Sequence, residues 1–240
     1  MAIVAFPPIE QADENGLLAF GGDMEISSLR LAYQGGIFPW PIGPGYPLAW
    51  FSPNPRGILF FDDLHLSRSL KKYIKQQHFS ITFNRAFKEV ITNCALTSNR
   101  KIKGSTSHDT WITPEIIKAY INFHHAGHAY SVEVWQDDLL VGGLYGVRIG
   151  QAVSGESMFF NVDNASKIAL AALMVYLKQN QITWLDTQMV TQVVATMGGK
   201  EIDRKNFIEL LNKSSPLDGD HLFNSKLFFD AKHLLGQTTK

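Results

Sequence analysis

The stretch GESMFFNVDNASKIALAALMVYLKQNQITWLDTQ, residues 155–188, decides the expected fold. Its apolar and polar runs predict a strand end, a turn, a helix over 165–179 and a second strand. The strand ends carry Glu156, Asp186 and Gln188, and alternate strand residues share a face, so Asp186 and Gln188 are expected to project together. Polar groups in apolar surroundings cost stability unless they are satisfied, so these residues indicate a site. A buried polar network that only ties strands together is the alternative.

The elements around this stretch predict an α+β fold. Upstream, Thr113 and Pro114 begin a helix, and AYSVEVWQ, LLVGGLYGVRI and QAVSGESMFF form an antiparallel meander. Downstream we expect a short helix (190–196), a break at Gly198-Gly199, a helix (204–212), and a tail that packs back as strand or helix. This order is typical of a Gcn5-related N-acetyltransferase-like core, although a fold does not fix a function.

The N-terminal part contains a Pro-rich and aromatic-rich loop followed by short strands and helices. Ser27 is expected to cap a helix that ends at Gln34, and Asn84 to cap one that reaches Cys94. A strand (57–61) and a helix (66–77) lie between them. The aromatic loop is either a rigid cover of the core or a wall for an apolar ligand. We expect a small N-terminal α+β domain over 1–105 and an acetyltransferase-like domain over 106–240.

Composition and charge narrow the functional classes. The single Cys94 excludes an intrachain disulfide framework, and we expect a soluble, cytoplasmic protein with no signal peptide and no membrane span. The net charge of zero conceals a basic block, because residues 56–103 hold ten Lys or Arg against three Asp or Glu. Phosphates attract such a surface. A basic surface with no partner is an equal alternative on charge alone.

Several familiar chemistries are disfavoured by the motifs. HHAGH has no acid at metal-ligand spacing, so we expect helix-end histidines and no metal. GESMF lacks the second glycine of a nucleophile elbow. The glycines of GGLYGVRIG are expected to permit a bulge or the close approach of a ligand. NVDNASK lacks the glycines with which acetyltransferases hold coenzyme A, which argues against that cofactor.

Many short motifs in one order resemble the leucyl/phenylalanyl-tRNA–protein transferase family along nearly the full length. They are GLLAFGGDM, LAYQGGIFPW, WFSPNPRG, TWI, HHAGHAYSVEVW, LVGGLYGV, GESMF, NASKIAL and DTQ. The resemblance implies transfer of Leu or Phe, less readily Met, from Leu-tRNA or Phe-tRNA to proteins with an N-terminal Arg or Lys. Such proteins are then marked for N-degron degradation. It implies no cofactor, and we expect a monomer.

The resemblance also implies site residues. Asp186 and Gln188 are the implied catalytic pair, and Glu156 is implied to contact substrate. The residues that it implies as the lining of the aminoacyl and adenosine sites are Trp50, Trp111, Tyr120 and Leu144. On charge we add Arg68, Lys71, Lys72, Lys75 and Arg85 as tRNA-binding residues. The chain departs from the family at three positions. Phe51 stands where the family usually has a second Trp, Thr187 where it usually has Cys, and Leu144 where relatives often have Met.

The chemistry expected at this site is positioning rather than covalent catalysis. The donor ester is already activated, and an α-amine with a pKa of about 7.7–8.0 is partly neutral near pH 7. A side-chain amide is barely basic, so we expect Gln188 to accept a hydrogen bond from the amine while Asp186 orients its amide. The rival functions are an acetyl-coenzyme A-dependent N-acetyltransferase and a non-catalytic tRNA-binding protein.

Overall fold

The computed structural model describes residues 2–43, 45–96, 110–214, 223 and 228–237. Within them an eight-stranded sheet has the order β10-β4-β9-β8-β7-β6-β5-β11, and a three-stranded sheet has the order β1-β3-β2. The predicted α+β class is confirmed, and the acetyltransferase-like arrangement is compatible with this mixed sheet. The strands of the large sheet are β4 (Arg56–Phe60), β5 (Ser80–Phe83), β6 (Ala129–Gln136), β7 (Leu139–Ile149), β8 (Ala152–Phe160), β9 (Trp184–Gln188), β10 (Lys200–Ile202) and β11 (Phe228–Asp230).

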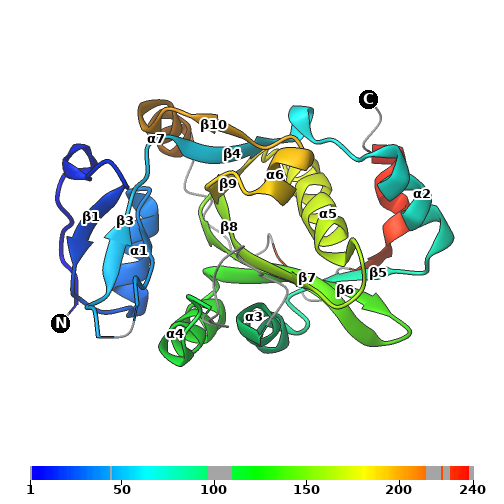
Figure 1. The fold of residues 1–240 in the computed structure, drawn as a ribbon, viewed down its shortest axis with the longest axis horizontal. Coiled ribbons are helices and arrows are strands. Elements are labelled where there is room, and N and C mark those ends of the chain that lie inside the picture. Colours follow the sequence, from blue (N-terminus) through cyan, green and yellow to red (C-terminus); the bar gives the residue numbers. More distant parts are fainter. Residues whose placement is uncertain (1, 44, 97–109, 215–222, 224–227, 238–240) are drawn as a thin grey trace.

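Helices cover both faces of the large sheet (Figure 1). Helix α5 (Ala165–Gln179) packs on one face, and α3 (Phe87–Leu96) and α4 (Pro114–His125) lie on the other. The remaining α-helices are α1 (Ile26–Gln34), α2 (Arg68–Gln76), α6 (Gln192–Thr196), α7 (Arg204–Lys213) and α8 (Leu234–Gln237). The small sheet is formed by β1 (Leu17–Phe20), β2 (Phe38–Pro39) and β3 (Ala49–Phe51), and it lies beside α1 at one end of the molecule.

The long apolar run of the sequence forms the central helix, α5. Twelve of the fifteen residues of α5 are buried, so nearly all sides of this helix contact protein. Gly142 on β7 lies directly against Ala165 at the start of α5, where a side chain would collide. The ladder between β7 and β8 is irregular between Tyr145 and Gly146. The expected bulge is confirmed, and the close approach at Gly142 is made by α5 of the same chain.

The helix between β8 and β9 places their ends side by side. Strands β8 and β9 run parallel, with Ser154 opposite Asp186. All other pairs in the large sheet are antiparallel among the described residues. Strand β9 also pairs with β4, in which Arg56 is the first residue. The polar residues at these strand ends therefore meet near the middle of the sheet.

Two predicted helix caps are wrong. Helix α1 begins at Ile26 with Glu25 before it and no side-chain cap, so Ser27 does not cap it. Asn84 lies three residues before α3, in a left-handed conformation, and its amide binds the chain at Ser131 and Phe223. The backbone N–H groups of Arg85 and Ala86 instead donate to Glu133 on β6. The predicted Thr113 cap of α4 is confirmed.

The predicted boundary between residues 105 and 106 lies outside the described residues, as does the polar stretch 97–109. Strands β4 and β5 precede that boundary and lie in the same sheet as β6 to β9. The two-domain division stays a prediction. The tail packs back as expected, because β11 pairs with β5. Among the described helices none is long and apolar enough to cross a membrane.

Candidate functional site

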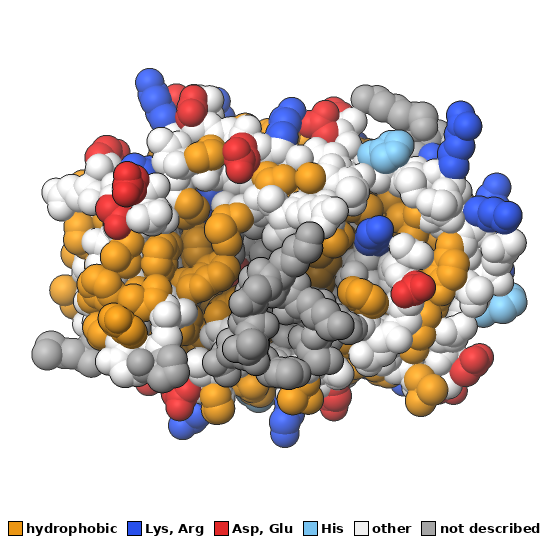
Figure 2. Space-filling view, viewed as in Figure 1, with side chains coloured by type: hydrophobic (Ala, Val, Ile, Leu, Met, Phe, Trp, Pro, Cys, Tyr) orange, Lys and Arg blue, Asp and Glu red, His pale blue; other side chains and the backbone are white. Residues whose placement is uncertain are grey.

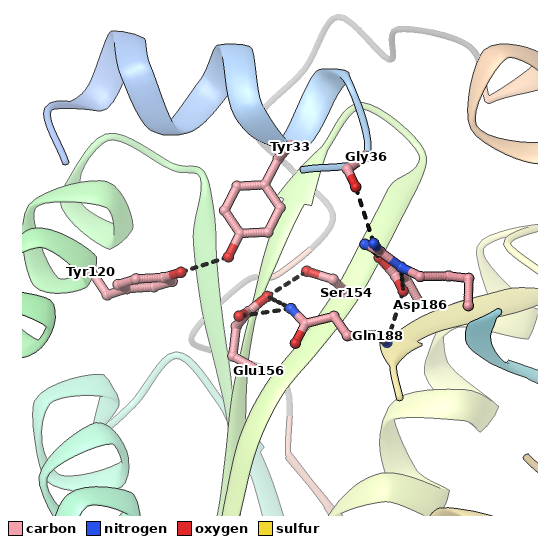
Figure 3. A network of polar contacts seen from close by, with 8 residues as sticks. Tyr33, Gly36, Tyr120, Ser154, Glu156, Asp186 and Gln188 are labelled. Atoms are coloured by element: carbon pink, nitrogen blue, oxygen red, sulfur yellow. Dashed lines mark hydrogen bonds and ion pairs between the residues drawn. The ribbon is translucent and has the colours of Figure 1, made fainter. Parts of the chain in front are cut away.

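The three polar residues predicted from the strand ends do meet in one network (Figure 3). Nε2 of Gln188 donates to both carboxylate oxygens of Glu156, at 2.9 Å each. Ser154 Oγ donates to the same carboxylate at 2.8 Å. The backbone N–H of Gln188 donates to Oδ1 of Asp186 at 2.9 Å. The parallel pairing of β8 with β9 brings these groups together.

Asp186 is held by Arg56, which the sequence did not indicate as a site residue. The guanidinium donates from Nε to Oδ1 at 2.9 Å and from NH2 to Oδ2 at 2.7 Å, a two-pronged contact. Both side chains are buried, at 1% and 8% exposure. Arg56 was counted in the basic block, but its burial removes it from the surface that a tRNA could contact.

Gln188 has an unusual backbone and an open acceptor. Its φ of +61° lies in the left-handed region, which is uncommon for residues other than glycine. The amide group points at Glu156, and Oε1 has no hydrogen-bond partner in the described part of the chain. Asp186 makes no hydrogen bond to this side-chain amide, so the expectation that it orients the amide by direct contact is wrong. Asp186 binds the backbone N–H of Gln188, and Glu156 orients the side chain.

Glu156 lies in an environment that resists its ionisation. Burial raises the pKa of this carboxyl, and hydrogen bonds from Gln188, Ser154 and Tyr33 act against that rise. Tyr33, on α1, and Tyr120, on α4, have hydroxyl oxygens 2.5 Å apart. Burial, followed by the nearby charge of Glu156, holds the pKa of both phenols well above the ordinary value. Tyr120 is therefore linked to the network by Tyr33. The sequence did not indicate Tyr33 as a site residue.

The aromatic residues implied to line the substrate site differ in exposure. Trp50 is 1% exposed, and its Nε1 donates to the Gly21 carbonyl at 2.8 Å. Leu144 is buried in the core. Trp111 is partly exposed and stacks on Trp40, with ring centroids 5.2 Å apart. From the sequence, Trp40 was only one of the aromatic residues of the Pro-rich loop, and the resemblance implied Trp50 but not Trp40 as a site residue.

Hydrophobic side chains gather over the end of the molecule where β1, β3 and α1 lie (Figure 2). Phe20, Ile42 and Tyr46 are among the exposed members there. A small cavity of about 20 Å³, which is room for one water, lies between Arg56, Asp186, Ser154 and Tyr33. Val147, Ile149 and Phe207 also line this cavity, so the polar network borders apolar side chains.

The basic residues lie at the other end of the sheet. Helix α2 is next to β5 and the far edge, away from α1 (Figure 1). Arg68, Lys72, Lys75 and Arg85 are exposed, and Lys71 is half-buried. Arg85 lies over the Trp135 ring, 5.1 Å from its centroid. Residues 100, 101 and 103 of the basic block lie outside the described residues.

The histidine motif has a structural explanation. His124 stacks on Phe87 with centroids 4.2 Å apart, and its Nδ1 lies 2.8 Å from the Ala129 carbonyl oxygen. Burial lowers the pKa of His124. The described residues contain no group of three or more His, Cys, Asp or Glu side chains that could hold a metal ion. His124 and His125 lie in the last turn of α4, as expected.

Two family models match this chain. The model described as leucyl/phenylalanyl-tRNA protein transferase covers residues 58–212, and the model of that family's N-terminal domain covers 22–54. Three bacterial proteins are among the relatives that carry the name leucyl/phenylalanyl-tRNA–protein transferase. The Flavobacterium johnsoniae protein is 48% identical over 206 residues, which is 86% of this chain and 94% of the relative. The Pectobacterium carotovorum protein is 49% identical over 209 residues (87% and 85%), and the Azotobacter vinelandii protein is 46% identical over 210 residues (87% and 90%).

Proposed function

The chain belongs to the leucyl/phenylalanyl-tRNA–protein transferase family, whose members are aminoacyltransferases, and on this basis we propose its donor and acceptor substrates. It moves Leu or Phe, less readily Met, from aminoacyl-tRNA to the N-terminal Arg or Lys of acceptor proteins. The product carries one additional peptide bond and is marked for N-degron degradation. The observation that carries the proposal is the open Oε1 of Gln188, on an amide held by Glu156 beside an apolar region.

The reaction needs no covalent enzyme intermediate. The acceptor amine attacks the carbonyl carbon of the ester that joins the amino acid to the terminal ribose of the tRNA. A C–N bond forms, the C–O bond to the ribose breaks, and the amine proton ends on the ribose oxygen. Holding the two reactants in line can be worth roughly 7–11 kcal/mol of the barrier at the extreme. Positioning is therefore the main task of the site.

Gln188 positions the amine by accepting a hydrogen bond from its N–H group. Glu156 takes both hydrogen bonds from Nε2, and this orientation leaves Oε1 as the acceptor aimed away from the carboxylate. When Glu156 is ionised, its negative charge polarises the amide and increases the electron density on Oε1. The same charge favours an acceptor whose first side chain is cationic, which fits Arg and Lys.

The aminoacyl group and the terminal adenosine occupy the apolar end of the molecule. The stacked Trp40–Trp111 pair offers a partly exposed ring face, and stacking on a base is worth roughly 1–3 kcal/mol. Tyr120, Leu144 and Trp50 lie in the walls behind it. A hydrophobic pocket discriminates single methylenes by only about 1–3 kcal/mol, which accounts for use of both Leu and Phe.

The tRNA body lies along the basic end of the sheet. Arg68, Lys72, Lys75 and Arg85 are exposed and can meet phosphates, and Lys71 lies on the same helix. With the terminal adenosine at the Trp40–Trp111 pair, the tRNA passes across the sheet from α1 toward α2. This arrangement separates recognition of the amino acid from the binding energy supplied by phosphates.

A transfer assay tests the proposal. Purified protein is incubated with tRNA carrying labelled Leu and a peptide that begins with Arg, and incorporation of label is measured. A peptide that begins with Asp is the control, and it should remain unlabelled. Modification by acetyl-coenzyme A in place of Leu-tRNA would support an N-acetyltransferase, and tRNA binding without incorporation would support a non-catalytic binding protein.

A further inference from the structure

Arg56 lies where four elements converge on one buried guanidinium. Its side chain is 1% exposed. Besides the two contacts with Asp186 on β9, NH1 donates to the Gly36 carbonyl after α1 at 3.0 Å. The guanidinium also lies over the rings of Phe38 on β2 and Phe207 on α7, 4.9 Å and 4.3 Å from their centroids. These contacts use the planar, five-donor geometry that arginine has and lysine lacks.

The Asp186 carboxylate passes this constraint to Gln188. Oδ1 of Asp186 accepts from Arg56 Nε and from the backbone N–H of Gln188, at 2.9 Å each. That N–H belongs to the residue with φ of +61°, a conformation that costs energy and persists only where surrounding contacts hold it. The side chain that leaves this strained residue is the one that reaches Glu156. Its direction therefore depends on the Asp186 contact.

We infer that Arg56 is a positioning residue of the transfer reaction, acting through Asp186 to fix the direction of the Gln188 amide. Through Gly36 it also holds the end of α1, the helix that carries Tyr33. Without Arg56, Asp186 becomes a buried carboxylate with no cationic partner, a state that favours a turn of its side chain toward solvent. That turn releases the N–H of Gln188. Arg56 touches no reacting atom in this scheme.

The inference rests on the proposed aminoacyl transfer, and kinetic constants of two variants test it. Arg56→Lys keeps the charge and loses the two-pronged geometry, whereas Arg56→Ala loses both. Because a displacement of about 1 Å can cost about 100-fold in rate, we expect kcat to fall about 10-fold in R56K and about 100-fold in R56A. The KM for aminoacyl-tRNA should stay unchanged, since the ligand contacts lie elsewhere.

A matched control separates positioning from lost stability. Val134→Ala removes buried volume from β6 in the same sheet, away from Asp186 and Gln188. All variants are assayed well below their own Tm. V134A should lower the Tm and keep the wild-type kcat. Guanidinium ion at low millimolar concentration should restore part of the R56A rate, and urea at the same concentration should not.

An activity-independent readout keeps this inference distinct from the proposed function. The Gln188 side-chain amide signals, assigned by their loss in Gln188→Ala, are followed by ¹⁵N NMR without substrate. We expect them to move toward the position of a solvated amide in R56K and to stay in place in V134A. Unmoved signals in R56K, or wild-type kcat in R56K and R56A, would overturn the role of Arg56. An inactive wild-type protein whose amide signals do move in R56K would overturn only the transfer reaction.

Discussion

Glu156 and Gln188 form a carboxylate–amide pair in which a single Nε2 donates to both carboxylate oxygens. The pair joins β8 to β9 across the only parallel contact among the described strand pairs. It places a half-buried acid directly behind an amide whose oxygen remains open. Several measurable consequences follow from this pair and from the contacts around it.

Glu156→Gln should lower the rate of transfer without abolishing the fold. The glutamine oxygen still accepts from Gln188 Nε2, but a hydrogen bond to a neutral group is roughly half as strong as one to a charged group. We expect kcat/KM for an Arg-terminated peptide to fall about tenfold, which corresponds to about 1.4 kcal/mol. Steady-state transfer to the peptide at fixed Leu-tRNA measures it. Comparing an Arg-terminated peptide with an uncharged one checks the charge, because loss of preference between them is expected in E156Q.

The Tyr33–Tyr120 hydroxyl pair predicts a non-additive effect on stability. Tyr33→Phe alone leaves the buried Tyr120 hydroxyl without this partner, which should reduce the free energy of unfolding by about 1–3 kcal/mol. Replacing both tyrosines by phenylalanine removes both polar groups and should recover much of that loss. Urea denaturation of the two single variants and the double variant measures the coupling. Additive losses would show that the hydroxyls act independently.

Salt dependence locates the tRNA. Lys72 and Lys75 are exposed on α2, and replacing both by glutamine should weaken tRNA binding and make the slope of log Kd against log salt shallower by about 1 for each lost phosphate contact. Lys205 and Lys213, exposed on α7, provide a matched pair with the same charge change. Filter binding of uncharged tRNA at several salt concentrations compares them. Equal slopes in the two double variants would place the tRNA away from α2.

Glu133 predicts how stability depends on pH. Burial raises the pKa of this carboxyl above its ordinary value of 4.5, while the Ser131 and Thr82 hydroxyls, each at 2.5 Å, act against the rise. Between the ordinary and folded pKa values the folded state binds more protons than the unfolded state, so stability falls as pH rises through that window and then levels off. Glu133→Gln removes this contribution. Urea denaturation should show a smaller fall across the window in E133Q, and an unchanged fall would exclude Glu133 as its source.

The local sequence pattern was enough to predict the helix and the strand that position the site residues. Helix α5 and strand β9 follow from a contiguous apolar run with a polar turn before it, so Glu156, Asp186 and Gln188 could be placed together from sequence. The partners of those residues could not. Arg56 is 130 residues from Asp186, and Tyr33 is 87 residues from Tyr120. Neither has a signal that a single sequence distinguishes from an ordinary surface arginine or core tyrosine.

The wrong caps, and the inability to separate Trp40 from Trp50 by sequence, have the same cause. Asn84 is of a residue type that often caps helices, but Glu133 from a neighbouring strand already satisfies the N–H groups before α3. Trp40 and Trp50 lie in similar Pro-rich surroundings. Only their tertiary contacts separate a partly exposed stacking ring from one that is buried against Phe6.

The long sequence distance between Arg56 and Asp186 also bears on synthesis of the protein. Domains fold as their residues leave the ribosome, and contacts between distant residues form only after the intervening chain is available. A nascent chain that has emerged only as far as α5 has its buried arginine but not yet the carboxylate that neutralises it. Strand β9 must then insert between β4 and β8, which are already present. The Arg56–Asp186 arrangement is therefore completed late in translation, and we expect truncated translation products that lack β9 to have no transferase activity.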